Sequence, residues 1–253
     1  MLDSNPAGNS GARSPIAVLP QYWSDEQGRR RYLDQLFDGT ARDYDFVERL
    51  LAFGTGSRYR RDALKRAGLK PGMCVLDIAT GTGLVAREAL AIVGPEGSVM
   101  GLDPSPGMLA EARGLAIPLV RGLGEKLPYA TASFDFVCMG FALRHVADLD
   151  ALFSEIRRVL KPGGTACILE ITRPRRKLVS GSLHLFMTRV VPAVAWITRR
   201  GKEAGSLMHF YWDTIDACVR PEVVLQALRR CGFPAPRREV ILGMFSEYVA
   251  QNN

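Results

Sequence analysis

Two glycines and two aspartates lie in and after short apolar runs, at a spacing that suits a nucleotide-like cofactor. Residues 75–90 read VLDIATGTGLVAREAL: Asp77 lies near the end of an apolar run, Gly81 and Gly83 follow, and Asp103 ends the next apolar run. Glycines at such a turn let the backbone approach a ligand closely, and a carboxylate one strand later can accept both hydroxyls of a ribose. The glycine pattern alone is weak evidence, because it also suits a dinucleotide.

The charge of Asp77 distinguishes between two cofactors. A carboxylate there would repel the pyrophosphate of a dinucleotide, whereas it suits the sulfonium and ammonium groups of S-adenosylmethionine, which has no phosphate. Asp103 is then placed to accept the ribose hydroxyls, and Met108 is near enough to contact the adenine. We therefore predict S-adenosylmethionine as the cofactor. In the competing interpretation, Asp77 and Asp103 only cap helices.

These residues need a sheet that brings strand ends together, and the pattern along the chain predicts one. Short apolar runs alternate with helical patterns, which indicates βαβ units and a parallel sheet covered on both faces. Two closing runs at 238–243 and 245–251 predict a strand pair around Gly243 that completes seven strands. The predicted fold class is α/β: a doubly wound, seven-stranded Rossmann-like methyltransferase sheet with a helical cap. The five earlier strands are expected at residues 74–79, 98–103, 118–122, 134–140 and 165–171.

The composition predicts one domain with a polar N-terminal tail. Residues 1–20 are rich in Gly, Ser, Pro and Asn and show no periodicity, so we expect a poorly ordered tail. Residues 21–253 then form a single methyltransferase domain. Helices at about 24–69 and an insertion at about 174–219 are expected to form its cap.

Charge and cysteine usage exclude several classes of function. The net charge of +7 is spread along the chain without a nucleic-acid-binding motif, so we predict no nucleic-acid partner. The cysteines stand singly in apolar contexts, so we predict buried thiols and no metal site. The first residues lack a basic and then apolar signal, which favours a cytoplasmic protein. The cysteines are Cys74, Cys138, Cys167, Cys218 and Cys231.

One apolar segment in the insertion has two interpretations. Residues 180–200 are apolar but are interrupted by His184, Arg189 and Pro192, and we expect them not to span a bilayer. Basic clusters flank the segment at 173–177 and 199–202. It is either a cap helix with solvated charges at its ends, or a lid for a prenyl tail that rests on an anionic membrane.

Six stretches resemble, in order, the ubiquinone/menaquinone C-methyltransferase family. The glycine loop is common to many methyltransferases, whereas the Phe-Asp and Tyr-Asp pairs within 37–45 and the Gly-Phe-x-Leu-Arg run at 140–144 are more particular. The resemblance covers about residues 36–172 and implies methyl transfer from S-adenosylmethionine to a ring or alkene carbon of a prenylated acceptor. The stretches are LFDGTARDYDFVERLLAFGTGSRYRR (36–61), VLDIATGTG (75–83), GLDPSPGML (101–109), GEKLPYATASFDFV (124–137), GFALRHVADLD (140–150) and RRVLKPGGTACILEIT (157–172).

The chain departs from the family pattern at three places. Leu123 and Gly124 replace an Asn or Asp followed by Ala, so the side-chain bond to the adenine amino group is missing and only the backbone amide of Gly124 can still serve in binding the adenine. His145 replaces an asparagine, and Met208 and Phe210 occupy tyrosine positions. The acceptor pocket is therefore expected to differ. The predicted cofactor-binding residues are Asp77, Ala79, Gly81, Gly83, Asp103, Pro104, Met108, Gly124 and Phe141.

Three residues are the predicted catalytic group. Arg144 resembles the catalytic arginine of the family and would stabilise an oxyanion, because guanidinium is a poor base. His145 is the better proton acceptor near neutral pH, or else only a structural hydrogen-bonding residue. Tyr44 either lines the sulfonium side of the pocket or packs a helix on the sheet. The predicted acceptor pocket contains Arg58, Met208, Phe210, Tyr211 and Trp212.

Three functions remain open from the sequence. The first is C-methylation of a hydrophobic, prenylated quinol or related aromatic. The second is C-methylation of an isoprenoid alkene such as a prenyl diphosphate, with or without cyclisation, in which aromatic residues shelter a carbocation and arginines 58, 60 and 61 hold the diphosphate. The third is a cofactor-binding protein without catalysis. Peripheral membrane contact and a homodimer are the further interactions that we leave open.

Overall fold

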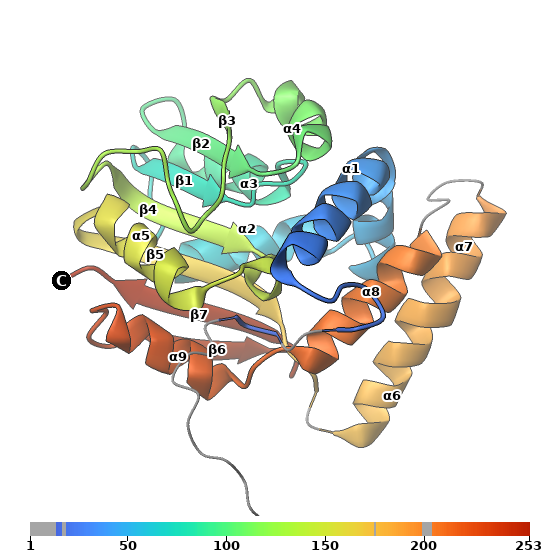
Figure 1. Cartoon of the computed structure of the whole chain (residues 1–253). Coiled ribbons are helices and arrows are strands. Elements are labelled where there is room, and N and C mark those ends of the chain that lie inside the picture. Colours follow the sequence, from blue (N-terminus) through green and yellow to red (C-terminus); the bar gives the residue numbers. More distant parts are fainter. Residues whose placement is uncertain (1–13, 17–18, 175, 199–203) are drawn as a thin grey trace, which may run out of the picture.

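One seven-stranded sheet forms the centre of the computed structural model, which describes residues 14–16, 19–174, 176–198 and 204–253 (Figure 1). The strand order is β3-β2-β1-β4-β5-β7-β6. All pairs from β3 to β5 are parallel, and β7 runs antiparallel to both of its neighbours. The predicted fold class is thereby confirmed. The strands are β1 (Cys74–Ile78), β2 (Ser98–Asp103), β3 (Leu119–Arg121), β4 (Phe134–Gly140), β5 (Leu160–Ile171), β6 (Arg237–Ile241) and β7 (Phe245–Gln251).

Helices cover both faces of the sheet because the strand side chains alternate between two apolar cores. On β1, Val75 joins the core beneath α2 and α3, whereas Leu76 and Ile78 join the core beneath α5 and α9. The carboxyl ends of the parallel strands are left for loops, which is where ligands bind in such folds. The helices of this layer are α2 (Gly56–Arg66), α3 (Leu84–Val93), α4 (Pro106–Ala112), α5 (Leu149–Val159) and α9 (Pro221–Arg230), with short 3₁₀ turns η1 (Arg113–Leu115) and η2 (Leu143–His145).

A third apolar core lies in the cap, which consists of α1 and the insertion helices beside one end of the sheet (Figure 1). Trp23, Val47, Val191 and Phe210 are buried in it. The helix α6–η3–α7 carries a π-helical turn that ends two residues before Pro192, whose missing amide hydrogen interrupts the regular ladder. The cap helices are α1 (Glu26–Leu51), α6 (Lys177–Leu185), η3 (Phe186–Val190), α7 (Val191–Ile197) and α8 (Ala204–Ala217).

Part of the stretch expected as a poorly ordered tail packs on the cap instead. Ile16 is buried and pairs with Cys218 in an isolated β-bridge, and the Val219 amide donates to the Pro15 carbonyl at 2.7 Å. The apolar side chain of Ile16 explains why the chain is held there. Residues 1–13, also expected to belong to that tail, lie outside the described residues.

Candidate active site

The glycine loop after β1 bends sharply because several of its residues adopt left-handed backbone conformations. Gly81 and Gly83 have φ angles of 56° and 87°, and Ala79, directly after β1, has a φ of 53°. A Cβ atom on Gly83 would lie 2.3 Å from Leu115 Cδ1. Phe141, directly after β4, has a φ of 60°. Such strain in non-glycine residues is concentrated at functional sites.

Asp103 ends β2 and fixes the loops on both sides of it. Its carboxylate accepts hydrogen bonds from the amides of Gly81 and Ser105, each at 2.8 Å. Burial raises the pKa of Asp103 to about 6, although these amides favour the charged form and the Asp38 carboxylate opposes it. Asp103 lines the cleft at the strand ends, as the cofactor prediction requires.

Asp77 does not face that cleft. It is fully buried, and its two oxygens accept from the Thr80 hydroxyl at 2.7 Å and the Cys138 thiol at 3.4 Å. The Ala86 amide, in the first turn of α3, also donates to it, and burial raises its pKa to about 7. Asp77 therefore anchors the glycine loop and the start of α3, which is close to the competing interpretation that it caps a helix.

Two aspartates of α1 accept hydrogen bonds from the loops of the cleft. Asp38 accepts from the Ser105 hydroxyl at 2.5 Å and from the Gly107 amide at 3.0 Å, at the start of α4. Asp45 accepts from the Thr82 hydroxyl at 2.5 Å, within the glycine loop. Asp38 and Asp45 are the aspartates of the Phe-Asp and Tyr-Asp pairs, which already stood out in the sequence. The sequence did not reveal their hydrogen-bond partners. Helix α1 therefore positions both binding loops.

The strand-end cleft contains most of the predicted cofactor-binding residues. Asp103 and the glycine turn lie at one side, and Met108 and Leu123 contribute an apolar slot. A Cβ atom on Gly124 would come 2.7 Å from Leu152 Cδ1, so this wall lies close to the core. A carboxylate beside an apolar slot suits the ribose and adenine of the predicted cofactor. The predicted residues in the lining are Ala79, Gly81, Asp103, Pro104, Met108, Gly124 and Phe141.

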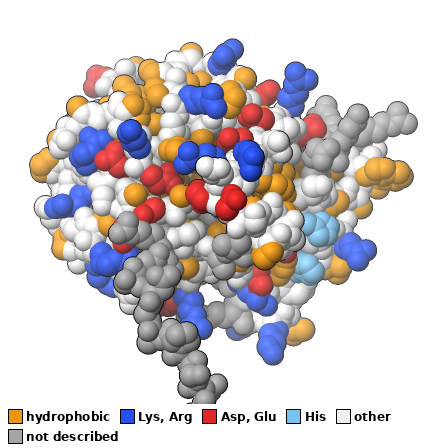
Figure 2. All heavy atoms as spheres, in the orientation of Figure 1, with side chains coloured by type: hydrophobic (Ala, Val, Ile, Leu, Met, Phe, Trp, Pro, Cys, Tyr) orange, Lys and Arg blue, Asp and Glu red, His pale blue; other side chains and the backbone are white. Residues whose placement is uncertain are grey.

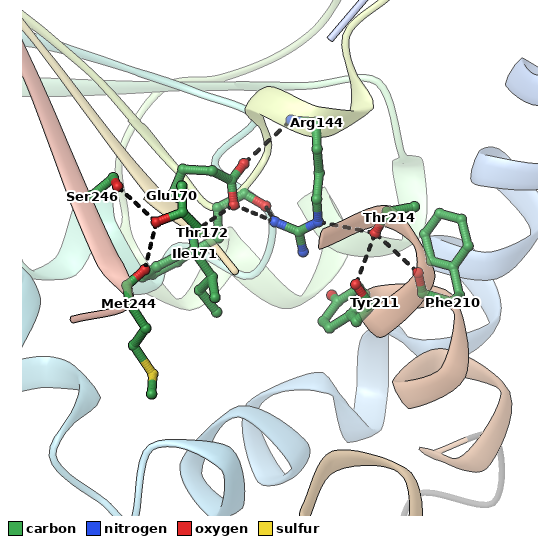
Figure 3. Close-up of polar contacts among 10 residues, drawn as sticks. Arg144, Glu170, Ile171, Thr172, Phe210, Tyr211, Thr214, Met244 and Ser246 are labelled. Carbon is green, nitrogen blue, oxygen red and sulfur yellow. Dashed lines mark hydrogen bonds and ion pairs between the residues drawn. The ribbon is translucent and has the colours of Figure 1, made fainter. Parts of the chain in front are cut away.

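Arg144 is buried where η2, β5 and α8 meet (Figure 3). Its Nη1 donates to Glu170 Oε1 at 2.5 Å, and its Nε donates to the Thr214 hydroxyl at 3.2 Å. Burial opposes the charged form, but the Glu170 carboxylate keeps the pKa of Arg144 above its ordinary value. The side chain is therefore a permanent cation and hydrogen-bond donor, which is compatible with oxyanion stabilisation and excludes a role as base.

A second cavity, the apolar chamber, adjoins the strand-end cleft. The two cavities share Tyr44, Phe141 and Tyr211 in their linings. The hydroxyls of Tyr44 and Tyr211 are hydrogen bonded to each other, and burial raises the pKa of both. Neither tyrosine is therefore a base near neutral pH. Apolar side chains of the cap helices and of β7 line the chamber, among them Val47, Leu51, Leu183, Met187, Leu207 and Phe245.

His145 lies in the cleft, but its environment does not make it the better proton acceptor that the sequence suggested. Its ring stacks on Phe210 at 5.5 Å and meets Phe37 edge-on at 5.3 Å. Burial, followed by the positive charges of Arg144 and Arg29, holds its pKa well below 6.5. Both ring nitrogens are buried without a hydrogen-bond partner. The histidine is neutral near pH 7 and a weak base.

Only part of the predicted acceptor pocket faces a cavity. Tyr211 lines both cavities, whereas the adjacent Phe210 and Met208 are fully buried in the cap core. Trp212 packs on the His184 ring at 4.6 Å. Successive residues on a helix point about 100° apart, so one α8 face can line the cavities while its neighbours pack inside the cap.

The arginine run of α2 also divides between surface and cavity. The side chain of Arg58 is 89% exposed and lies 3.8 Å from Asp62, outside both cavities. Arg61 pairs with Glu88 at 2.7 Å. Arg60 is 3% exposed and lines the apolar chamber. Of this arginine run, Arg60 and not Arg58 therefore lies at the pocket.

Solved structures that are similar in fold include methyltransferases. A SAM-dependent methyltransferase from Aquifex aeolicus aligns with a TM-score of 0.55 and 21% identity, covering 77% of this chain and 89% of that one. The phosphoethanolamine N-methyltransferase 2 of Haemonchus contortus, in complex with S-adenosyl-L-methionine, aligns with a TM-score of 0.62 and 19% identity, covering 88% and 59%. At these identities the likeness shows the fold alone.

Sequence relatives are closer. Residues 25–233 match the ubiE/COQ5 methyltransferase family. The demethylmenaquinone methyltransferase of Symbiobacterium thermophilum is 31% identical over 81% of this chain and 86% of its own length. The ubiquinone/menaquinone biosynthesis C-methyltransferase UbiE of Geobacter sulfurreducens is 37% identical over 70% and 71%. These matches confirm the family that the motifs resemble: the chain belongs to the ubiE/COQ5 methyltransferase family and is an S-adenosylmethionine-dependent methyltransferase.

Proposed function

We propose that this enzyme methylates a ring carbon of a quinol that carries a hydrophobic, prenyl-type tail. The observation that carries the proposal is the junction of the strand-end cleft with the apolar chamber at Tyr44, Phe141 and Tyr211. A cofactor in the cleft and an apolar acceptor in the chamber would meet there. The relatives support the acceptor class, since one is a 2-phytyl-1,4-naphtoquinone methyltransferase of Synechococcus elongatus, 37% identical over 64% of this chain and 74% of its own length.

The residues at the junction support alignment and charge stabilisation as the main catalytic effects. S-adenosylmethionine supplies a methyl group on a sulfonium, which is already a good leaving group. The chamber walls exclude water and restrict the acceptor, so that its carbon is held in line for attack. Asp103, Met108 and Gly124 are proposed to hold the adenosine part of the cofactor.

Arg144 is the proposed partner of the developing phenolate. A quinol carbon becomes a better nucleophile when its neighbouring hydroxyl loses a proton. The buried guanidinium of Arg144 favours that anion, while the raised pKa values of Tyr44 and Tyr211 and the lowered pKa of His145 argue against these groups as bases. We infer that the acceptor reacts as an anion held near Arg144, with its proton lost to water through the cleft.

The charges of the chamber disfavour a prenyl diphosphate. A diphosphate needs several uncompensated cations, yet Arg144 is paired with Glu170 and Arg60 with Glu48. Arg58 lies on the surface. The chamber therefore does not suit a group that carries several negative charges. A protein without catalysis is disfavoured because the cavities for two reactants meet at shared residues.

Product analysis tests the proposal. The enzyme is incubated with methyl-deuterated S-adenosylmethionine and, in parallel, a reduced 2-prenyl-1,4-naphthoquinone or farnesyl diphosphate. We expect a product from the quinol in which one ring hydrogen is replaced by a trideuteromethyl group, with the label assigned to the ring carbon by tandem mass spectrometry. The Arg58→Met variant, which is altered only at the surface, should give the same products as the wild type. Labelled farnesyl diphosphate with unlabelled quinol would overturn the proposal.

We also propose that the outer face of α6–η3–α7 rests on an anionic membrane. This segment, Lys177–Ile197, is the one described helix that is long and apolar enough to cross a membrane by length and composition, with a mean hydropathy of 1.4, and most of it is not buried inside the molecule. Leu178, Leu185 and Trp196 are 87%, 60% and 82% exposed on it. Figure 2 shows hydrophobic side chains at the edge of the molecule where α7 lies.

Charge supports a lipid surface as the partner of this face. Residues 177–197 contain no acidic residue, and Arg176, Lys177 and Arg189 are exposed along them. Leu183 and Met187 of the same helix line the apolar chamber, so an acceptor tail could pass from membrane to chamber along one element.

Vesicle flotation tests the membrane contact. The wild type should float with vesicles that contain anionic lipid, and the Leu178→Glu/Trp196→Glu variant should remain at the bottom. Ala91→Glu/Ala130→Glu is the control with the same change of charge, because these residues are exposed on α3 and on the loop before β4, away from this helix. Equal flotation of wild type and double variant would contradict the assignment.

A further inference from the structure

Besides Arg144, a second charged group interrupts the apolar wall of the chamber, the pair of Arg60 and Glu48. Arg60 Nη2 donates to Glu48 Oε1 at 2.6 Å, and both residues line the cavity. The guanidinium also lies 5.5 Å from the centre of the Phe141 ring. Gly56 is required for this arrangement, since a Cβ atom there would lie 2.3 Å from Glu48 Oε1 and 2.7 Å from Arg60 Nη1. The start of α2 is therefore shaped around the pair.

Arg60 differs from two other anchored arginines, Arg29 and Arg158, in its unused donors. Its Nε and Nη1 are buried and have no hydrogen-bond partner. By contrast, Arg29 directs Nε and Nη2 to Glu26 and Nη1 to the His145 carbonyl, and Arg158 divides its three nitrogens in the same way among Glu155 and backbone carbonyls. Buried donors without partners are costly, so their persistence beside a cavity needs an explanation.

We propose that Arg60 Nε and Nη1 bind an oxygen of the acceptor, and thereby select acceptors that carry a second ring oxygen. This inference rests on the proposed quinol function. Because Glu48 already balances the charge of Arg60, the group that fits is a neutral hydroxyl or carbonyl oxygen rather than a phosphate. Arg144 then stabilises the oxygen next to the reacting carbon, and Arg60 binds the oxygen across the ring.

The simpler alternative is that the pair only ties α2 to α1. A structural pair would affect the temperature of unfolding and both acceptors equally. A binding pair would affect the KM for one acceptor and leave kcat and cofactor affinity almost unchanged. The two roles are therefore separable by comparing acceptors with and without the second oxygen.

Two probes and two variants provide this comparison. The probes are 2-prenyl-1,4-naphthohydroquinone and the 1-naphthol that carries the prenyl group at carbon 3, which keeps the hydroxyl beside the reacting carbon and lacks the other. Arg60→Met removes the donors, and Arg60→Lys keeps a cation for Glu48 while it loses the planar fork. Arg58→Met is the surface control, and calorimetry with S-adenosylhomocysteine checks the cofactor cleft.

For Arg60→Met and Arg60→Lys we expect the KM for the hydroquinone to rise about tenfold or more, with kcat within about threefold. The KM for the naphthol, already high in the wild type, should change less than about threefold. Equal changes for both probes, or none, would overturn the role of Arg60 while leaving the proposed function intact. Failure of the wild type to methylate either probe would overturn the proposed function, and this inference with it.

Discussion

Cofactor affinity should depend on pH through Asp103. Burial raises the pKa of this carboxyl to about 6, well above its ordinary value of 3.8. The ionised carboxylate can accept hydrogen bonds from both ribose hydroxyls while it retains the Gly81 and Ser105 amides, whereas the protonated group has lost acceptor capacity. Affinity is therefore expected to be full above this pKa and to weaken as the pH falls through about 6.

The size of the effect follows from the ionised fraction. A carboxyl with a pKa of about 6 is about one-tenth ionised at pH 5 and almost wholly ionised at pH 7.5. If only the ionised form binds well, the Kd for S-adenosylhomocysteine should rise about tenfold between these values, which corresponds to about 1.4 kcal/mol. Isothermal titration calorimetry at five pH values, in buffers of matched ionic strength, measures it directly. Calorimetry should also report proton release on binding near pH 6.

Two variants control for other groups that titrate nearby. Asp103→Asn keeps the shape of the side chain without a titration, so its affinity should be lower and nearly independent of pH between 5 and 7.5. Asp77, whose pKa burial raises to about 7, lies behind the glycine loop, and Asp77→Asn should retain the slope due to Asp103. A flat wild-type profile, or a full slope in Asp103→Asn, would refute the reasoning.

Three further predictions concern the supports of the site. Because burial raises the pKa of Asp77 to about 7, the folded state holds its proton more tightly than the unfolded chain does, so stability should fall as pH rises from about 4 to 7. In Asp77→Asn, the free energy of unfolding should fall less between these pH values than in the wild type, by at least about 1 kcal/mol, as measured by urea unfolding at both ends of the range. Asp38→Ala should weaken cofactor binding by about 1 kcal/mol in calorimetry, since it releases the start of α4, while thermal unfolding changes little. Gly83→Ala should destabilise by more than 1 kcal/mol because of its φ of 87° and the crowded Cβ position, whereas Gly39→Ala, inside α1 with open space around it, should stabilise slightly; urea unfolding compares the two.

Acidic and basic side chains are intermixed over the face shown in Figure 2, which is consistent with a charge spread along the chain. Net charge is additive along a sequence, so it is read without a structure. Which charges pair with one another, by contrast, depends on the fold. Arg144 and Glu170 form a buried pair that also draws on Thr214 of α8, three segments that only the fold brings together.

The sequence by itself determined the elements and their order. Apolar runs with the period of strands alternate with helical patterns, and turn residues stand between them, so local physics was sufficient for the sheet and for the glycine loop. It also identified Asp103, because a carboxylate at the end of the second strand must lie at the carboxyl edge of a parallel sheet. Arg144, which follows the end of β4, was indicated only by the resemblance to the family motif.

Only the tertiary structure decided which side of each element faces the reactants. Asp77 turns behind the loop to Thr80 and Cys138, because the strand alternates its side chains and α3 packs over that face. On α8, Tyr211 reaches the cavities while Phe210 enters the cap core, and on α2 Arg60 turns inward while Arg58 meets solvent. When a helix is apolar or basic on several sides, its sequence does not show which face is buried. That face is set by the neighbours against which it packs, and those neighbours come from distant parts of the chain.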